Sequence, residues 1–453
     1  MPVGKSKTTD NFSGGMMKRF CVALLAAAMV AGSALCATAA DVKFSGSYYV
    51  QGNYADNWKL GDEDTGTTNS ADYGQRLRMG MDFKVAEGLT LTTRFDALEG
   101  IWGSSFGTYG DRTYDRSNNG ADENNISFDR AYVTFAVPFG KFIVGRAPSS
   151  NWGTIFGNND YDADMIKYIG NFGPVEVGVY TEKIKESYNP AAVNNVNDAD
   201  SDNYHVYGKY KWNSGLAGLK FQYARDASNR ITATPYTNST FQVSPYAQAT
   251  FGPVFVEAEI NWYAWGEREY DNATPDRDYD NGFNAYVHAK GDFGPAYVGG
   301  LYAYSAGQDP DETAANGGDV TSGPAGGLIW NPTLIMWNEF TNKWLGNLGT
   351  ANTAGTTDSM SNAHLFQIYA GYKPMPKLDL KASVAYAMAD EEPTGYDDVY
   401  GTELDLTAAY KIYDNLTYTV GAGYLWAGDY FEGATNGTND DTYLLMHRLD
   451  LTF

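Results

Sequence analysis

The stretch that decides the fold runs from Val42 to Tyr54 and reads VKFSGSYYVQGNY. Its even positions carry Val, Phe, Gly, Tyr, Val, Gly and Tyr, whereas its odd positions carry Lys, Ser, Ser, Tyr, Gln and Asn. Because successive side chains of a β-strand point to opposite faces, one face of this segment is apolar and the other is polar. This alternation is typical of a strand that separates lipid from water, and it predicts a membrane-spanning β-strand.

The same alternation recurs along the chain in segments of about ten residues. We count eighteen such segments, of which the last is Thr442–Phe453. Sixteen is the alternative, if the short pair Lys141–Arg146 and Met165–Gly170 does not belong to the series. The sequence therefore predicts an all-β fold, a transmembrane antiparallel up-and-down β-barrel.

The connections between these segments also alternate in length. Short turns such as Glu87-Gly88 and Gly252-Pro253 are followed by long loops rich in Asp, Asn, Gly and Thr, such as Ala55–Tyr73. Bacterial barrels have short periplasmic turns and longer external loops, so we expect the short turns on the periplasmic side.

The composition favours a barrel over a soluble β-sandwich, the other all-β fold considered. Aromatic residues make up 15% of the chain, with 35 Tyr and 50 Gly, and the mean hydropathy is negative. Aromatic girdles and a wet interior account for this combination. Residues 40–453 hold 28 Lys and Arg against 54 Asp and Glu, which makes nucleic acid a poor candidate partner.

Residues 1–39 have the features of an export segment. Lys18 and Arg19 precede the apolar run Phe20–Ala31, and small residues follow at Ala37–Ala40. This order predicts an N-terminal extension and a cleaved signal peptide over 1–39, with the barrel domain over 40–453.

The extension before the signal is longer than a signal peptide needs, so we expect the true start at Met16 or Met17. Both cysteines, Cys21 and Cys36, lie in the segment to be removed. The mature chain is therefore expected to contain no disulfide.

Three blocks of sequence carry a resemblance to a known family. They are the start ADVKFSG at Ala40–Gly46, the block from Arg130-Ala131-Tyr132-Val133-Thr134-Phe135 to Val144-Gly145-Arg146, and the terminal strand that ends on Phe453. Together they resemble the trimeric outer-membrane porins, closest to the homotrimeric porin family of Desulfovibrio-type sulfate-reducing bacteria. The resemblance implies a homotrimer in the Gram-negative outer membrane that acts as a passive diffusion channel for small hydrophilic solutes and ions. It also implies that Phe453 is recognised by the barrel assembly machinery.

In these porins the segment after the fifth strand folds into the lumen as a constriction loop. The matching segment here is Ala147–Asp164, which lacks the Pro-Glu-Phe-Gly motif of the best-known porins. Its candidate acidic residues are Asp160, Asp162 and Asp164. The candidate basic residues at lumen-facing positions are Arg76, Arg78, Arg94, Arg130 and Lys141.

Two arrangements of these charges are open. The cations and the loop carboxylates face each other across water and create a transverse field, or the arginines pair with Asp82, Asp96 and other acids of the wall. A substrate-preferring channel for anionic or sugar-like solutes, with the arginines as a ladder, is the alternative function.

No enzyme activity, cofactor or metal is expected. The alternate acids of the loop lack the Gly and distal Glu of a calcium loop, and none of the four His lies in a nucleophile motif. A structural or adhesive barrel remains an alternative through the long stretch Ser305–Asn362. Within it, Asn331–Gly346 is compatible with a short helix that caps the pore, enters the lumen or touches a neighbouring subunit.

Deletion of Phe453 should lower the amount of barrel in the outer membrane and leave export across the inner membrane intact, because the resemblance makes this residue the assembly signal. Immunoblots of outer-membrane and periplasmic fractions measure both quantities. Wild-type levels of the deletion variant in the outer membrane would contradict this role.

Overall fold

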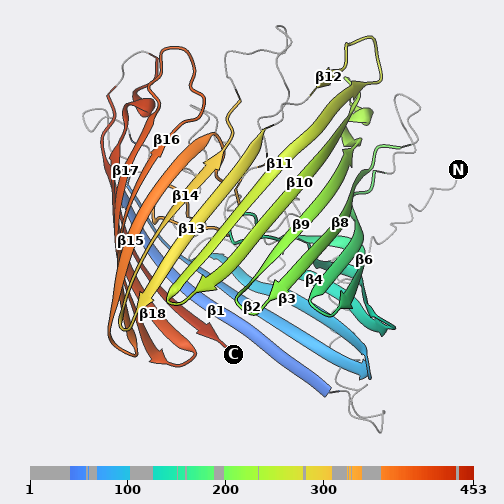
Figure 1. Cartoon of the computed structure of the whole chain (residues 1–453). Coiled ribbons are helices and arrows are strands. Elements are labelled where there is room, and N and C mark those ends of the chain that lie inside the picture. Colours follow the sequence, from blue (N-terminus) through green and yellow to red (C-terminus); the bar gives the residue numbers. More distant parts are fainter. Residues whose placement is uncertain are drawn as a thin grey trace, which may run out of the picture.

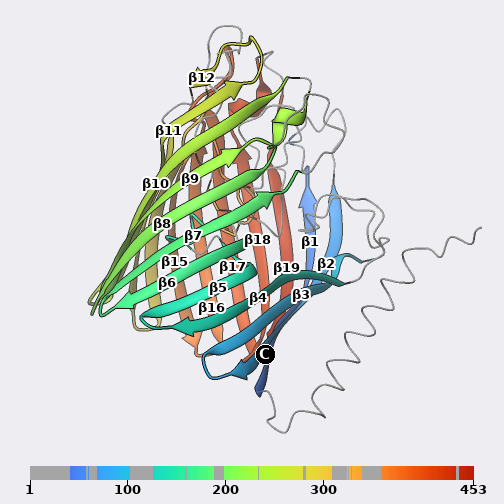
Figure 2. The ribbon, with the colours of Figure 1, turned by 90° about the vertical axis from the view of Figure 1, so that its right-hand side faces the viewer.

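The described residues of the computed structural model form one closed antiparallel sheet (Figures 1 and 2). They are residues 41–57, 60, 69–102, 126–149, 152–158, 161–187, 198–232, 234–278, 282–308, 324, 326–327, 329–338, 359–434 and 438–453. The predicted export segment 1–39 lies outside them.

The strands follow one another along the chain, and the described parts of the connections contain two short 3-10 turns. The first nine are β1 (Asp41–Asp56), β2 (Ser70–Ala86), β3 (Leu89–Ile101), β4 (Ile126–Val137), β5 (Gly140–Pro148), β6 (Asp162–Phe172), β7 (Val175–Lys185), β8 (Ser201–Trp212) and β9 (Gly215–Asp226). The next five are β10 (Tyr236–Phe251), β11 (Val254–Tyr270), β12 (Arg277–Asp278), β13 (Phe283–Phe293) and β14 (Ala296–Ser305). The last five are β15 (Ala363–Met375), β16 (Leu378–Met388), β17 (Val399–Tyr413), β18 (Leu416–Ala427) and β19 (Thr442–Thr452). The 3-10 turns are η2 (Ser228–Ile231) and η5 (Asp429–Glu432).

Pairing of the first strand with the last closes the sheet. β1 pairs with β19 over ten positions, from Ser47 opposite Thr452 to Asp56 opposite Tyr443. β12 has two residues and pairs only with β11, so it extends a loop and is no part of the barrel wall. The barrel therefore has eighteen strands, as predicted. The alternative of sixteen is wrong, since β5 and β6 each pair on both sides.

Exposure alternates along the strands as the sequence pattern predicts. Val206 is 53% exposed, whereas the adjacent His205 is 3% exposed; Ile368 is 69% exposed, and the adjacent Gln367 is 3% exposed. Large apolar side chains thus cover the outside of the barrel, and polar side chains are buried on the inside. This is the reverse of a soluble protein, and it is the distribution that a lipid environment requires.

The two ends of the barrel differ. Short turns gather at the lower end in Figure 1, and the long connections lie at the upper end. Three of these turns repeat the triplet Phe-Gly-Pro, in which Gly173, Gly252 and Gly294 have φ of 63°, 60° and 67°. Only glycine adopts this left-handed conformation without strain, so the repeated triplet marks one type of tight turn.

The barrel wall varies in height around its circumference. β5 has nine residues and β11 has seventeen, so the wall is lowest beside β5, which Figure 2 shows near the short-turn end. Of the helices in the described residues, none is long and apolar enough to cross a membrane.

The short helix considered within Asn331–Gly346 is wrong for the part that is described. Residues 331–338 form a series of bends. The reason is that a buried carboxylate and a buried amide of the barrel wall form hydrogen bonds with the backbone of this segment, so these backbone groups are not available for a helix. Residues 339–346 lie outside the described part.

Cysteine labelling tests the expected orientation. Asp429 lies at the long-loop end, and Asp414 lies in the short turn between β17 and β18. If short turns are periplasmic, Asp429→Cys should react with an impermeant thiol reagent on intact cells, whereas Asp414→Cys and Glu87→Cys should react only after the outer membrane is permeabilised. Equal labelling of Asp429→Cys and Glu87→Cys on intact cells would refute the expected orientation. Asp64, the other residue expected outside, lies outside the described part.

Candidate functional site

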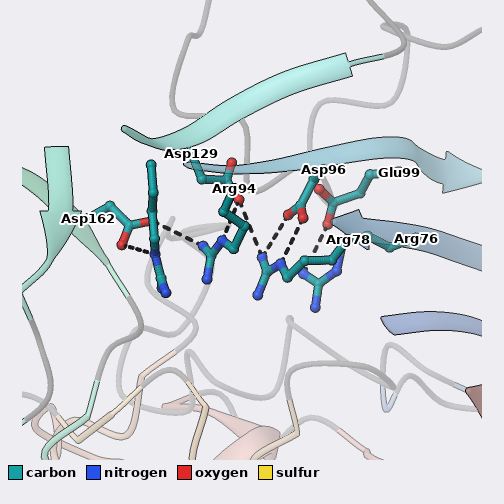
Figure 3. A network of polar contacts seen from close by, with 8 residues as sticks. Arg76, Arg78, Arg94, Asp96, Glu99, Asp129 and Asp162 are labelled. Atoms are coloured by element: carbon teal, nitrogen blue, oxygen red, sulfur yellow. Dashed lines mark hydrogen bonds and ion pairs between the residues drawn. The ribbon is translucent and has the colours of Figure 1, made fainter. Parts of the chain in front are cut away.

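Four arginines form a row on the inner wall of β2, β3 and β4, which we call the arginine row: Arg76, Arg78, Arg94 and Arg130. Figure 3 shows the first three of them with their acidic partners. Each one is paired with a carboxylate of the wall. Arg78 donates two hydrogen bonds to Asp96, at 2.7 and 2.6 Å, and Arg76 contacts Glu99 at 3.4 Å. The two hydrogen bonds from Arg78 to one carboxylate fix the orientation of its guanidinium group.

The row continues to β6 through shared carboxylates. Asp129 accepts a hydrogen bond from Arg94 at 3.0 Å and lies 3.7 Å from Arg78. Asp162 accepts from Arg94 at 3.0 Å and from Arg130 at 2.7 Å. Arg78, Arg94 and Arg130 therefore form one network of alternating charge with three acids, Asp96, Asp129 and Asp162. The pair Arg76–Glu99 lies beside this network.

A fifth arginine, which the sequence analysis missed, extends the row in the other direction. Arg448 on β19 lies over the ring of Tyr49, 4.1 Å from its centroid, and Arg76 lies over the same ring at 5.3 Å. Arg448 also donates to Gln51 at 3.1 Å. The signal was present in the sequence, because Arg448 alternates with outward apolar residues on the last predicted strand.

The predicted site residues are therefore only partly brought together. The pairing of the arginines with wall acids is observed, and Asp96 takes part in it. Asp82 does not, since it accepts a hydrogen bond from Thr92 instead, at 2.6 Å. Lys141 lies at the short-turn end of β5, away from the row.

The three predicted loop acids have different fates. Asp162 joins the arginine row, and Asp160 lies outside the described residues. Asp164 is placed on the outside of the barrel, 3.5 Å from Arg146, with side chains 61% and 43% exposed. It shares this face with Ile166, which is 56% exposed. The loop ends before Asp164, and strand alternation then turns its side chain outward.

The connection between β5 and β6 enters the barrel, which confirms the expected constriction loop. Its residues 152–158 form the first inward segment. Trp152 donates from its indole nitrogen to the backbone oxygen of Ser244 on β10 at 3.0 Å. Thr154 donates to Glu259 on β11 through its backbone N–H at 2.5 Å and through its hydroxyl at 2.7 Å.

Glycine permits the close contact between the segment and Glu259. Gly153 has φ of 77°, and a Cβ there would lie 2.4 Å from the Glu259 carboxylate. A Cβ on Gly157 would come within 1.9 Å of the same group. At these two positions the backbone approaches the carboxylate too closely for any side chain, which only glycine allows.

A second acid, Glu182 on β7, holds the two ends of this connection. It accepts hydrogen bonds from the hydroxyl of Ser149 and from Tyr161, the latter at 2.8 Å. Burial, with the charge of Glu182 in addition, raises the pKa of Tyr161, so the phenol stays protonated and donates. The side chain of Glu182 is fully buried.

Part of the long stretch between β14 and β15 also lies inside the barrel. Residues 329–338, the second inward segment, bring three backbone N–H groups to the buried Glu403 on β17. The N–H groups of Leu334, Ile335 and Met336 donate to it at 2.9, 2.6 and 2.8 Å. Gln367 on β15 donates to the Pro332 oxygen at 2.5 Å.

The two inward segments touch each other. Phe156 of the first packs edge-on against Trp330 of the second, with ring centroids 4.9 Å apart, and stacks on Tyr286 of β13 at 5.1 Å. Gly327 donates its backbone N–H to the oxygen of Phe156. The described part of Ser305–Asn362 thus enters the lumen, one of the three placements left open.

The anchors named for the inward segments all lie between β7 and β17, opposite the arginine row. The arrangement therefore narrows the lumen with two polar-anchored segments on one side and fixed cations on the other. Within the described ranges, no group of three or more His, Cys, Asp or Glu residues could hold a metal ion.

A family model matches the chain, and its description agrees with the barrel fold and the narrowed lumen. The model of a family described as Gram-negative porin matches residues 23–327, more than half of the 453 residues. No curated protein is similar enough to the chain to match it.

Several solved structures are similar to the chain at low sequence identity. Acinetobacter baumannii OccAB1 is 12% identical over 90% of this chain and 96% of that chain, with a TM-score of 0.50. An anion-selective porin from Comamonas acidovorans is 12% identical over 91% of this chain and 100% of that chain, with a TM-score of 0.45. Pseudomonas aeruginosa OccK8 is 11% identical over 91% and 98%, with a TM-score of 0.48. At 12% identity, the similarity to OccAB1 bears on the fold alone.

Replacement of either buried carboxylate, Glu403 or Glu259, should release from the barrel wall the inward segment that it binds. In Glu403→Ala, three backbone N–H groups of the second inward segment lose their acceptor, at a cost of about 1–3 kcal/mol for each one left buried and unsatisfied. Glu259→Ala removes the acceptor of the Thr154 N–H and of the Thr154 hydroxyl in the first segment. We expect larger and noisier single-channel currents from both variants in planar bilayers.

Glu87→Ala is the matched control, since its side chain is 93% exposed in a short turn, and its currents should equal those of the wild type. Wild-type currents from both anchor variants, at normal barrel levels, would show that these carboxylates do not hold the segments in place.

Proposed function

The chain belongs to the Gram-negative porin family, and from that premise we propose that small hydrophilic solutes and ions diffuse through its lumen along the arginine row. The observation that carries this proposal is the placement of the two inward segments. They pack on the wall from β7 to β18, so the polar wall from β19 to β4 remains as the lining of the passage. Its side chains are charged and hydrogen-bonded, which suits solutes that carry their own polar groups.

The charge arrangement explains why the passage should be broadly permissive. Each guanidinium of the row is balanced by Asp96, Glu99, Asp129 or Asp162 within 3.4 Å. A balanced row offers polar solutes ordered donors and acceptors without a large net potential. The charges are held rigidly, so their field does not have to reorganise as a solute passes.

A charged patch on the outer face of the barrel supports contact between subunits. Arg146 and Asp164 form an ion pair on that face, beside the low wall at β5. Charge on a lipid-facing surface is costly, so this patch fits contact with a neighbouring subunit better than contact with lipid. We propose that the protein forms a homotrimer in the outer membrane and that the signal in residues 1–39 directs its export. We also propose, from the three sequence blocks that carry the resemblance, that it belongs to the Desulfovibrio-type branch of the porins.

An adhesive or structural barrel is less well supported. That alternative depended on Ser305–Asn362 as an external surface, but its residues 329–338 are anchored inside the barrel by Glu403 and Gln367. We likewise propose that the protein is a channel and no enzyme, in keeping with the family and the fold.

Reversal potentials under a KCl gradient test the passage. Arg94→Gln leaves Asp129 and Asp162 without a shared cation and should shift permeability towards cations. Asp162→Asn removes one acid from the row and should shift it towards anions. Both shifts should shrink at 1 M salt, where the screening length is about 3 Å.

Two results would count against the proposal. If the purified wild-type protein carries no current at all, it is not a diffusion channel. If it conducts but neither variant changes the reversal potential, the solutes do not pass along the arginine row.

A further inference from the structure

A second group of cations lies on the inner wall, away from the arginine row. It consists of Lys167 on β6, Lys209 on β8 and Lys220 on β9, which we call the lysine cluster. Each occupies an inward position of its strand: Lys167 is opposite Tyr180, Lys209 is opposite Glu176, and Lys220 is opposite Tyr207. The three lysines lie on neighbouring parts of one wall.

Aromatic rings bring the three ammonium groups together. Lys167 Nζ lies 4.4 Å from the ring centroid of Tyr180 and 5.6 Å from that of Tyr207. Lys209 Nζ lies 5.3 Å from Tyr207 and 5.3 Å from Trp152, and Lys220 Nζ lies 5.7 Å from Trp152. Ring faces attract cations within about 6 Å and bear no charge of their own. They therefore hold the lysines in place without neutralising them.

The nearby carboxylates are largely occupied by other donors. Glu182 accepts from Ser149, Tyr161 and Asn203 and contacts His205. Glu259 accepts from the backbone and hydroxyl of Thr154 and from Asn261. Both acids are thus used to hold the first inward segment and the wall around it.

The cluster is consequently poor in direct ion pairs. Lys209 lies 3.6 Å from Glu176, but in the described part of the chain neither Lys167 nor Lys220 forms a salt bridge. The arginines of the row differ, since each is bonded to at least one acid. A solute anion would have to displace a wall carboxylate to bind at the arginine row, whereas in the lysine cluster only Lys209 has such a partner, Glu176. The side chain of Lys209 is 29% exposed, and the other two are half-buried.

We propose that the lysine cluster is a binding station for small oxyanions, carboxylates or phosphates, on the lumen wall. An oxyanion placed among the three ammonium groups would accept hydrogen bonds from them and relieve their mutual repulsion. The proposal rests on the proposed function, since solutes must enter the lumen to reach it. It assigns anion preference to Lys167, Lys209 and Lys220, and a broadly neutral role to the arginine row.

The test combines the double variant K167Q/K220Q with planar-bilayer recording. In the wild type, citrate and inorganic phosphate added to a KCl solution should reduce the chloride current. In the double variant this reduction should disappear, and the chloride-to-potassium permeability ratio should fall roughly threefold. Loss of the citrate effect alone identifies carboxylates as the ligands, and loss of the phosphate effect alone identifies phosphates.

Two control variants keep the test decisive. K167R/K220R retains both charges and should behave as the wild type, which separates charge from packing. Lys183→Gln removes a lysine that is already paired with Asp200 and Asp202, at 2.8 and 2.9 Å, and should leave selectivity unchanged. A conducting K167Q/K220Q channel with wild-type selectivity and anion block would overturn the inference, and so would an equal shift in Lys183→Gln. A wild type that does not conduct would instead refute the proposed function.

Discussion

The structure depends on one constraint: a backbone N–H or C=O that faces hydrocarbon has no water to bond. Pairing of β1 with β19 removes the last open edge of the sheet, so every wall strand has a partner on both sides. A barrel that is closed in this way leaves only the side chains to respond to their surroundings. Apolar side chains then take the outward positions, and the polar half of each strand is directed into the lumen.

The inward polar groups in turn determine what the lumen contains. Buried acids need donors, and these come from two sources. Asp96, Asp129 and Asp162 take guanidinium groups from the same wall. Glu259 and Glu403 take backbone N–H groups from segments that have folded inward. A single requirement, that buried polar groups be bonded, therefore produces both the charged wall and the narrowing opposite it.

Much of the fold could be predicted from the sequence because a strand has a period of two, which is visible without any knowledge of its neighbours. The site was harder to predict. The alternation in β11 shows that Glu259 faces inward, but its partner Thr154 lies 105 residues away. Glu403 likewise binds backbone groups, which leave no mark in the sequence. The lysines were missed because their aromatic partners resemble ordinary girdle residues. Asp164 was misplaced because the residue at which β6 begins determines whether its side chain points into or out of the barrel.

The central claim is that solutes pass along the wall from β19 to β4 while the two inward segments cover most of the wall opposite. Cysteine accessibility during conduction tests this most directly, because the mature chain is expected to have no thiol. Ser47 lies beside Arg78 on the inward face, and Ala385 faces inward but is 1% exposed next to the second inward segment. A charged thiol reagent should reduce the current stepwise in Ser47→Cys and leave Ala385→Cys unaffected. Rapid modification of Ala385→Cys, with none at Ser47→Cys, would contradict the account.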